Sequence, residues 1–253
     1  MPAFTGKRYP PWKTISPHSE VKKPDRPSGI GIMGGTFNPV HTGHLRVAEE
    51  VRETLRLEKV IFVPAGNPPL KAGSGLAPAR KRLDMVRLAV ADNPFFEVSD
   101  LECSKSGPSY TVGTLERLSD AYPGKKLFFI TGIDVFLDLH LWWRPERLIE
   151  LADFVVVSRP GYLFAGILAS PFVFKGKNLA KKKKELAAFD EAGKAGKTVS
   201  LKLASGRGLH LLRVTGLEIS ARHIRALLKE GRSARYLLPE HVLSFIIQNK
   251  IKF

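Results

Sequence analysis

Cysteine and long apolar runs are nearly absent from the 253 residues. The single cysteine, Cys103, cannot form an intramolecular disulfide, and no zinc-type Cys/His spacing surrounds it, so we expect a cytoplasmic, reducing location. No segment approaches the roughly 20 apolar residues of a membrane-spanning helix. Lys7 and Arg8 are followed by prolines instead of the apolar core of a secretory signal. The composition therefore argues against a membrane protein and a disulfide-stabilised secreted domain.

Acidic residues are scarce, with 24 Asp and Glu against 40 Lys and Arg and a net charge of +16. Residues 1–28 hold six basic and two acidic side chains, and residues 161–210 hold ten and three. Such charge suggests an anionic partner such as RNA or an acidic protein. Neither segment interleaves aromatic and basic residues as single-strand binding surfaces do, so we expect mostly solvated charge and treat nucleic acid as a minor alternative.

Residues 1–28 contain six prolines and no sustained periodicity, which predicts a basic, disordered arm before a domain at 29–253. Apolar runs predict strands at 29–34, 59–65, 96–101, 126–131, 154–157 and 210–214. Amphipathic segments predict helices at 44–57, 78–92, 110–122, 145–151, 220–230 and 239–249. Their alternation predicts an α/β, doubly wound parallel sheet of the Rossmann-like kind with a small C-terminal helical part.

Two details complete this prediction. Ser109 has the position of an N-cap for the helix at 110–122. Residues 162–208 are rich in lysine and glycine with weak periodicity, so we expect no regular element there and interpret the segment as a basic insertion.

The most informative segment runs from Gly34 to His44, between the first strand and the first amphipathic helix. Its Gly-Gly pair lets backbone N–H groups approach an anion, and His41 and His44 supply donors where a helix dipole already favours negative charge. The glycines are not followed by Lys-Ser or Lys-Thr and do not form G-x-G-x-x-G, which argues against a kinase-like or dehydrogenase site. We expect chemistry at a nucleotide phosphate.

A second anion site is predicted at the start of the helix at 220–230. Ser220 would cap this helix, and Arg225 lies on its first turns. An ordinary cap with a solvated basic face is the alternative when this segment is considered alone.

Together these segments resemble the signatures of bacterial nicotinate mononucleotide adenylyltransferases, in the nucleotidyltransferase superfamily. G-x-F-x-P-x-H-x-G-H spans Gly35 to His44, and I-S-x-x-x-I-R spans Ile219 to Arg225. Further segments resemble the family's P-P-H-K loop (Asn67 to Lys71), G-P-S-Y-T (Gly107 to Thr111), G-x-D (Gly132 to Asp134), W-W (Trp142 and Trp143) and R-P-G-Y (Arg159 to Tyr162).

The resemblance implies transfer of the adenylyl group of ATP to nicotinate mononucleotide, with Mg²⁺ as cofactor held mainly by phosphate oxygens and few protein ligands. It implies catalytic roles for His41, His44, Ser220 and Arg225. It implies ATP binding by Gly34, Gly35, Thr36, Phe37, His41, His44, Gly132, Asp134, Ile219, Ser220 and Arg225. It implies acceptor binding by Lys71, Tyr110, Thr111, Asp134, Trp142, Trp143 and Arg159, with Trp142 stacking on the pyridine ring.

Three departures from the family pattern stand out: Asn38 where Asp is frequent, Leu70 in place of the loop histidine, and Ala221-Arg222 in place of small hydroxyl residues. Leu70 puts in doubt any role assigned to that position. Adenylyltransferases for nicotinamide mononucleotide or phosphopantetheine, cytidylyltransferases for phosphorylated alcohols, and an inactive nucleic-acid-binding protein remain alternatives. The sequence is silent on oligomeric state.

Overall fold

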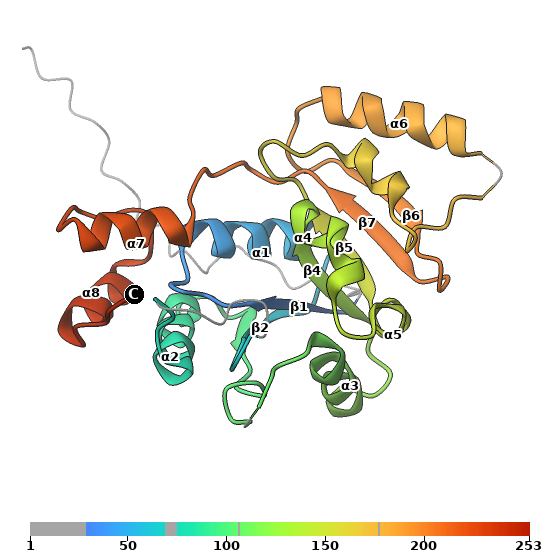
Figure 1. Ribbon diagram of the computed structural model, residues 1–253. Helices are drawn as coiled ribbons and strands as arrows, with labels where there is room; N and C mark the ends of the chain where they lie inside the picture. The colour runs from blue at the N-terminus through green and yellow to red at the C-terminus, as the bar shows by residue number, and fades with distance from the viewer. Residues whose placement is uncertain (1–28, 69–74, 106, 177) are drawn as a thin grey trace, which may run out of the picture.

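The computed structural model describes residues 29–68, 75–105, 107–176 and 178–253, and its core is a seven-stranded sheet in the order β3-β2-β1-β4-β5-β7-β6 (Figure 1). The strands are β1 (Ile30–Gly35), β2 (Lys59–Pro64), β3 (Phe96–Val98), β4 (Leu127–Gly132), β5 (Asp153–Val157), β6 (Thr198–Lys202) and β7 (Gly208–Leu212). All neighbours pair in parallel except β6, which runs antiparallel to β7. The predicted arm at 1–28 lies outside the described residues.

Helices cover both faces of the sheet. They are α1 (Thr42–Thr54), α2 (Ala79–Val90), α3 (Thr111–Ala121), α4 (Ile133–Leu137), α5 (Pro145–Leu151), α6 (Leu179–Glu191), α7 (Ala221–Lys229) and α8 (Glu240–Gln248). Buried side chains of α1, α2, α7 and α8 join one apolar cluster, and those of α3, α4, α5 and α6 join another. Phe128 and Phe129 of β4 enter opposite clusters, as the alternating side chains of a strand must. The predicted doubly wound sheet is confirmed.

The chain order reverses at the middle of this sheet. From β1 the chain passes through α1 to β2 on one side, whereas β4 lies on the other side of β1. Open parallel sheets bind ligands at such a point, beyond the carboxyl ends of the two strands. Gly35 ends β1 and Gly132 ends β4, so two of the predicted motifs flank this crevice.

Several predicted boundaries need correction. The third strand ends at Val98 because residues 101–104 form a turn, and the last predicted strand spans 208–212. The first helix begins at Thr42, before His44. Ser109 does not cap α3: its N-cap is Tyr110, and the Ser109 hydroxyl instead accepts a hydrogen bond from the backbone N–H of Asn67 at 3.2 Å.

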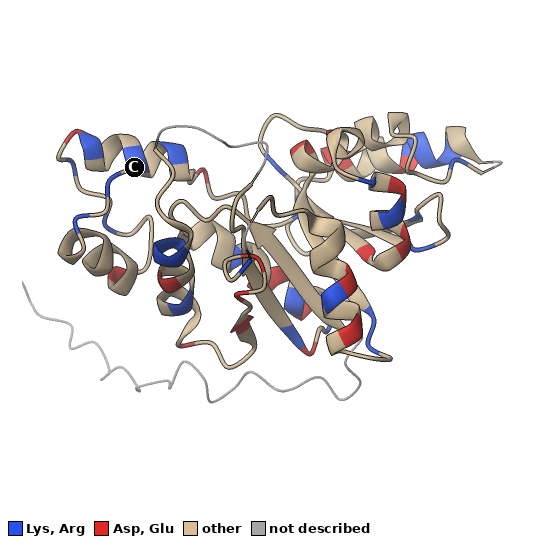
Figure 2. Cartoon of the chain, turned by 60° about the horizontal axis from the view of Figure 1, so that its bottom comes forward, with Lys and Arg blue, Asp and Glu red and all other residues tan. Residues whose placement is uncertain are grey.

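Residues 162–208 hold regular structure that the sequence analysis did not predict. A 3₁₀ helix (Phe164–Ala169), α6 and β6 lie in this segment, and β6 extends the sheet beyond β7. Leu186 and Phe189 are the buried side chains of α6, and its four lysines are exposed or partly exposed. The apolar stripe of this helix was therefore too narrow to recognise in the sequence. Figure 2 shows the basic stretch of α6 at the opposite end of the molecule from α7 and α8. None of the described helices is long and apolar enough to cross a bilayer.

Candidate active site

The two histidines lie together at the start of α1. Their rings stack with centroids 3.7 Å apart, and the backbone N–H of His41 donates to Nδ1 of His44 at 3.2 Å. Because Nδ1 of His44 accepts a hydrogen bond, the neutral ring carries its proton on Nε2. His44 therefore presents an N–H donor beside the N-terminus of a 13-residue helix, where the backbone dipole favours an anion.

The loop between β1 and α1 is shaped by Gly35 and Phe37. The backbone of Phe37 has a φ of 48°, and its buried ring packs edge-on against His44 at a centroid distance of 5.1 Å. A Cβ at Gly35 would lie 3.0 Å from the Phe37 ring, closer than side chains normally approach. Glycine at this position therefore lets the aromatic ring fold under the strand end and support His44.

The Ile219 to Arg225 motif, at the start of α7, lies next to the Gly34 to His44 motif. A Cβ at Gly43 would lie 3.1 Å from His41 Nδ1 and 3.8 Å from Ile219, so the two motifs are in contact distance. Arg225 donates to the backbone carbonyl of Asn38 at 2.9 Å. Ser220 accepts from the backbone N–H of His223 at 3.1 Å, which confirms its predicted role as the cap of α7.

A charged pair follows the carboxyl ends of β4 and β5. Arg159 Nε lies 3.5 Å from Asp134 Oδ1, which is buried and has no hydrogen-bond partner. A Cβ at Gly132 would collide with that same carboxylate oxygen, so only glycine leaves the Asp134 side chain in its place. The structure thus brings together the predicted residues Gly132, Asp134 and Arg159.

His41 is held neutral by its surroundings. Its side chain is 5% exposed, and burial together with the nearby positive charge of Arg159 lowers its pKa from 6.5 to about 4. Nδ1 of His41 is buried and has no hydrogen-bond partner. Since leaving a buried polar atom unpaired costs free energy, this atom and Oδ1 of Asp134 mark the crevice as a place where a polar ligand can complete the hydrogen bonding.

The predicted acceptor residues form a separate aromatic group. Trp143 is 59% exposed and Tyr110 39% exposed, and their rings lie 5.5 Å apart. Trp142 is half-buried and packs edge-on against Phe129 at 6.0 Å. Thr111 begins α3 directly after Tyr110. The predicted ligand Lys71 lies outside the described residues.

From the sequence, no site role was assigned to two residues, Arg82 and Asn38, that hold the loops of the site in place. Arg82 is 1% exposed and donates to three backbone carbonyls beneath the crevice, and Asn38 bonds the segment before α2 through both ends of its amide. The sequence could have indicated Arg82, because the residue lies three and four positions before Met85 and Val86 and therefore on the apolar face of α2. A charged residue in an apolar stripe indicates a buried polar role.

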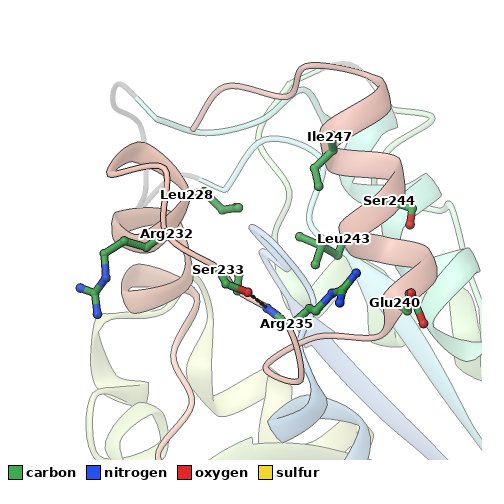
Figure 3. Close-up of a pocket in the computed structure, with 9 residues that line it drawn as sticks. Leu228, Arg232, Ser233, Arg235, Glu240, Leu243, Ser244 and Ile247 are labelled. Carbon is green, nitrogen blue, oxygen red and sulfur yellow. Dashed lines mark hydrogen bonds between the residues drawn. The ribbon is translucent and has the colours of Figure 1, made fainter.

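A pocket lies between α7 and α8 (Figure 3), and neither His41 nor His44 lines it. Leu228, Leu243 and Ile247 form its apolar side, and Arg232 and Arg235 lie at its rim. None of the predicted site residues lines it. The buried His41 Nδ1 and Asp134 Oδ1, neither of which has a hydrogen-bond partner, make the strand ends the better candidate site.

Comparisons with known proteins identify the family of this chain. The model of the family described as cytidylyltransferase-like matches residues 32–225. A protein of Geotalea daltonii named "Probable nicotinate-nucleotide adenylyltransferase" is 44% identical over 222 residues, covering 88% of this chain and 97% of its own length. A protein of Geobacter sulfurreducens with the same name is 43% identical over 222 residues, covering 87% and 96%.

Solved structures share the fold at lower identity. The nicotinic acid mononucleotide adenylyltransferase of Plasmodium falciparum complexed with NaAD has a TM-score of 0.64 at 18% identity, over 87% of this chain and 95% of that one. The same enzyme complexed with APC has a TM-score of 0.62. The resemblance inferred from the motifs is confirmed: the chain belongs to the cytidylyltransferase-like family and, within it, to the nicotinate-nucleotide adenylyltransferases.

Proposed function

We propose that this chain transfers the adenylyl group of ATP to nicotinate mononucleotide, giving nicotinic acid adenine dinucleotide and pyrophosphate, in NAD biosynthesis. One observation carries the proposal: His41, His44, Asp134 and Arg159 gather beyond the carboxyl ends of β1, β4 and β5, where the strand order reverses. The family relationship agrees with this reaction. A cytoplasmic location stays a prediction from composition.

The reaction needs positioning more than covalent chemistry. An oxygen of the acceptor's phosphate attacks the α-phosphorus of ATP, and the bond from that phosphorus to the bridging oxygen breaks as pyrophosphate leaves. In our proposal the Nε2–H of His44 donates to an α-phosphate oxygen as negative charge builds up there. His41, neutral and unpaired at Nδ1, holds the phosphates in line with the attacking oxygen.

The pyrophosphate end would be held from α7. Arg225 is anchored on the Asn38 carbonyl, which fixes its guanidinium beside the loop of the first motif. Ser220 keeps its hydroxyl proton available for donation, because it acts as an acceptor in capping α7. We assign both side chains to the β- and γ-phosphates of ATP.

The acceptor would lie on the side of β4 and α3. Oδ1 of Asp134 can accept a hydrogen bond from a ribose hydroxyl, and Arg159 can neutralise a phosphate. We assign the pyridine ring to Trp142, and the carboxylate to backbone N–H groups near Thr111 and Trp143. Discrimination against the carboxamide then depends on backbone geometry instead of a buried cation.

Mg²⁺ belongs to the substrate in this proposal, since ATP enters as its magnesium complex. Mg²⁺ usually keeps several water molecules and binds phosphate oxygens, with few protein ligands. Because Mg²⁺ offsets two of the negative charges of the phosphates, the complex brings less negative charge to His41 and Arg159 than free ATP would. Removing divalent metal with a chelator should abolish turnover, and Mg²⁺ should restore it.

The test is pyrophosphate release from ATP and Mg²⁺ with three acceptors compared in parallel: nicotinate mononucleotide, nicotinamide mononucleotide and phosphopantetheine. We expect a strong preference for the nicotinate acceptor. Equal rates with the two pyridine nucleotides would make the enzyme dual-specific. Release with phosphopantetheine alone, or with none of the three, would overturn the proposed acceptor.

A further inference from the structure

Arg82 on α2 lies directly beneath the crevice and bonds three separate loops. Its Nε donates to the carbonyl of Ala77 at 2.9 Å, one terminal nitrogen donates to Thr36 at 2.8 Å, and the other donates to Gly66 at 2.8 Å. Thr36 belongs to the loop after β1, Gly66 follows β2, and Ala77 precedes α2. One guanidinium therefore joins the loop after β1 to the segment that follows β2 and to the residues before α2.

The environment of Arg82 explains why this position needs arginine. The side chain is 1% exposed, so its positive charge is compensated by carbonyl dipoles and by the carboxylate of Glu102 nearby. The planar fork of arginine places donors in three directions at fixed angles. Lysine has a single nitrogen on a flexible stem and cannot reach all three carbonyls at once.

Glu102 extends the same network towards α3. Its carboxylate accepts from the Thr114 hydroxyl at 2.6 Å, and it is also bonded by the Ser109 hydroxyl and the backbone of Gly66. Ser109 in turn accepts from the Asn67 N–H. The segment that precedes Tyr110 and Thr111 is thereby tied to the loop after β2.

We infer that Arg82, together with Glu102, is a positioning residue that holds the ATP-side loop and the acceptor-side loops in one geometry. Neither side chain is assigned to a substrate. Arg82 acts through the backbone of Thr36 and Gly66, and Glu102 acts through Ser109 and Thr114. This inference rests on the proposed function for its kinetic consequences, but the loop geometry itself can be measured without any substrate.

The test compares Arg82→Lys with Arg80→Lys, a matched change two positions earlier on an arginine whose side chain is 72% exposed. Steady-state kinetics are measured for ATP and for the acceptor. Amide hydrogen exchange of the substrate-free protein is followed at residues 36–41, 65–68 and 107–111, and at β4 as a reference for global opening. Wild-type activity with nicotinate mononucleotide is established first, so failure of the proposed function is recognised separately.

We expect Arg82→Lys to lower kcat/KM by about a hundredfold and to raise KM for both substrates, because small displacements of positioning groups have effects of this size. Exchange should accelerate in the three loops while β4 stays protected. Arg80→Lys should match the wild type. A variant that is merely unstable would lower the active fraction, and so the apparent kcat, while leaving both KM values unchanged.

Thr114→Val provides a second variant that conserves volume and removes the hydroxyl, which donates to Glu102 at 2.6 Å and to the Tyr110 carbonyl at 3.5 Å. The Tyr110 carbonyl still accepts from the backbone N–H of residue 114, so the main loss is the bond to Glu102. It should accelerate exchange at 107–111 and raise KM for the acceptor more than for ATP. Unchanged KM values and unchanged loop exchange in both Arg82→Lys and Thr114→Val would overturn the inference. If Arg82→Lys does not fold, the exchange and KM values of Thr114→Val decide alone.

Discussion

The backbone N–H of His41 donates to Nδ1 of His44 at 3.2 Å, across two imidazole rings stacked 3.7 Å apart. This bond gives His44 two functions. It satisfies a backbone donor at the start of α1, as capping side chains do, and it fixes the proton on Nε2, where a phosphate can use it. The structural role of His44 uses Nδ1 and its proposed chemical role uses Nε2, so a substitution can remove one role and keep the other.

His44→Asn should separate these roles. The asparagine oxygen occupies nearly the position of Nδ1 and preserves the hydrogen bond from His41, but nothing replaces Nε2. We expect turnover to fall about a hundredfold with KM for ATP little changed. His44→Ala should lose the same turnover and, in addition, about 1 kcal/mol of unfolding free energy. Wild-type turnover in His44→Asn would refute the assigned donor.

His41 predicts a specific pH dependence of stability. Its folded pKa of about 4 lies below the ordinary 6.5, so between these values the unfolded chain binds more protons than the folded one. The stability is therefore fully present above about pH 6.5 and decreases as the pH falls towards 4, by about 3 kcal/mol from this group. Urea unfolding across this range should show a shallower decrease for His41→Asn than for the wild type. His140→Asn, at an exposed histidine, should follow the wild type.

Asn38→Asp tests a position at which the sequence analysis expects a departure from the family pattern. The Asn38 amide donates to the Gly75 carbonyl at 2.7 Å and accepts from the Ala77 N–H at 3.0 Å, with the residue 7% exposed. A carboxylate cannot donate and would face the Gly75 oxygen. We expect a loss of about 1 to 3 kcal/mol in unfolding free energy, measured by denaturant titration. Asn67→Asp, at an exposed site, should have no comparable effect.

The two tryptophans can be distinguished by kinetics. Trp142→Ala should raise KM for the nicotinate acceptor several-fold more than KM for ATP, as expected if its ring stacks on the pyridine. It should also lower the unfolding free energy by about 3 kcal/mol, because the partly buried Trp142 packs against Phe129 and the core around it. Trp143→Ala should spare stability and leave the acceptor KM nearly unchanged. The reverse order of KM effects would assign the ring contact to Trp143, which faces Tyr110.

Local sequence patterns were sufficient for the six parallel strands and for the motifs. Continuous apolar runs in β1, β2, β4 and β5 predict strands buried on both faces. Successive side chains of each strand then face opposite helix layers, because the side-chain period of a strand is two. The Gly34 to His44 segment places its histidines after a strand and at a helix start, whatever the rest of the chain does. For the same reason Ser220 could be recognised as a cap. These features depend on neighbours within a few residues.

The segment at 162–208 shows where local patterns are insufficient. α6 buries only Leu186 and Phe189, and β6 is defined by its pairing with β7. An edge strand with mostly exposed side chains has little apolar alternation of its own, so its partner decides its conformation. Whether this segment is an insertion relative to other members of the family stays a prediction.

The sequence by itself determined the order of the six parallel strands and of α1, α2, α3, α5, α7 and α8, and it identified the residues of both phosphate motifs. The tertiary structure decided how those motifs are held together. Arg225 and the carbonyl of Asn38 are 187 residues apart in the chain, and Arg82 lies 46 residues from Thr36. Such contacts form only when the assembled sheet brings distant segments together. The residues next to each partner in the sequence carry no pattern that would predict the contact.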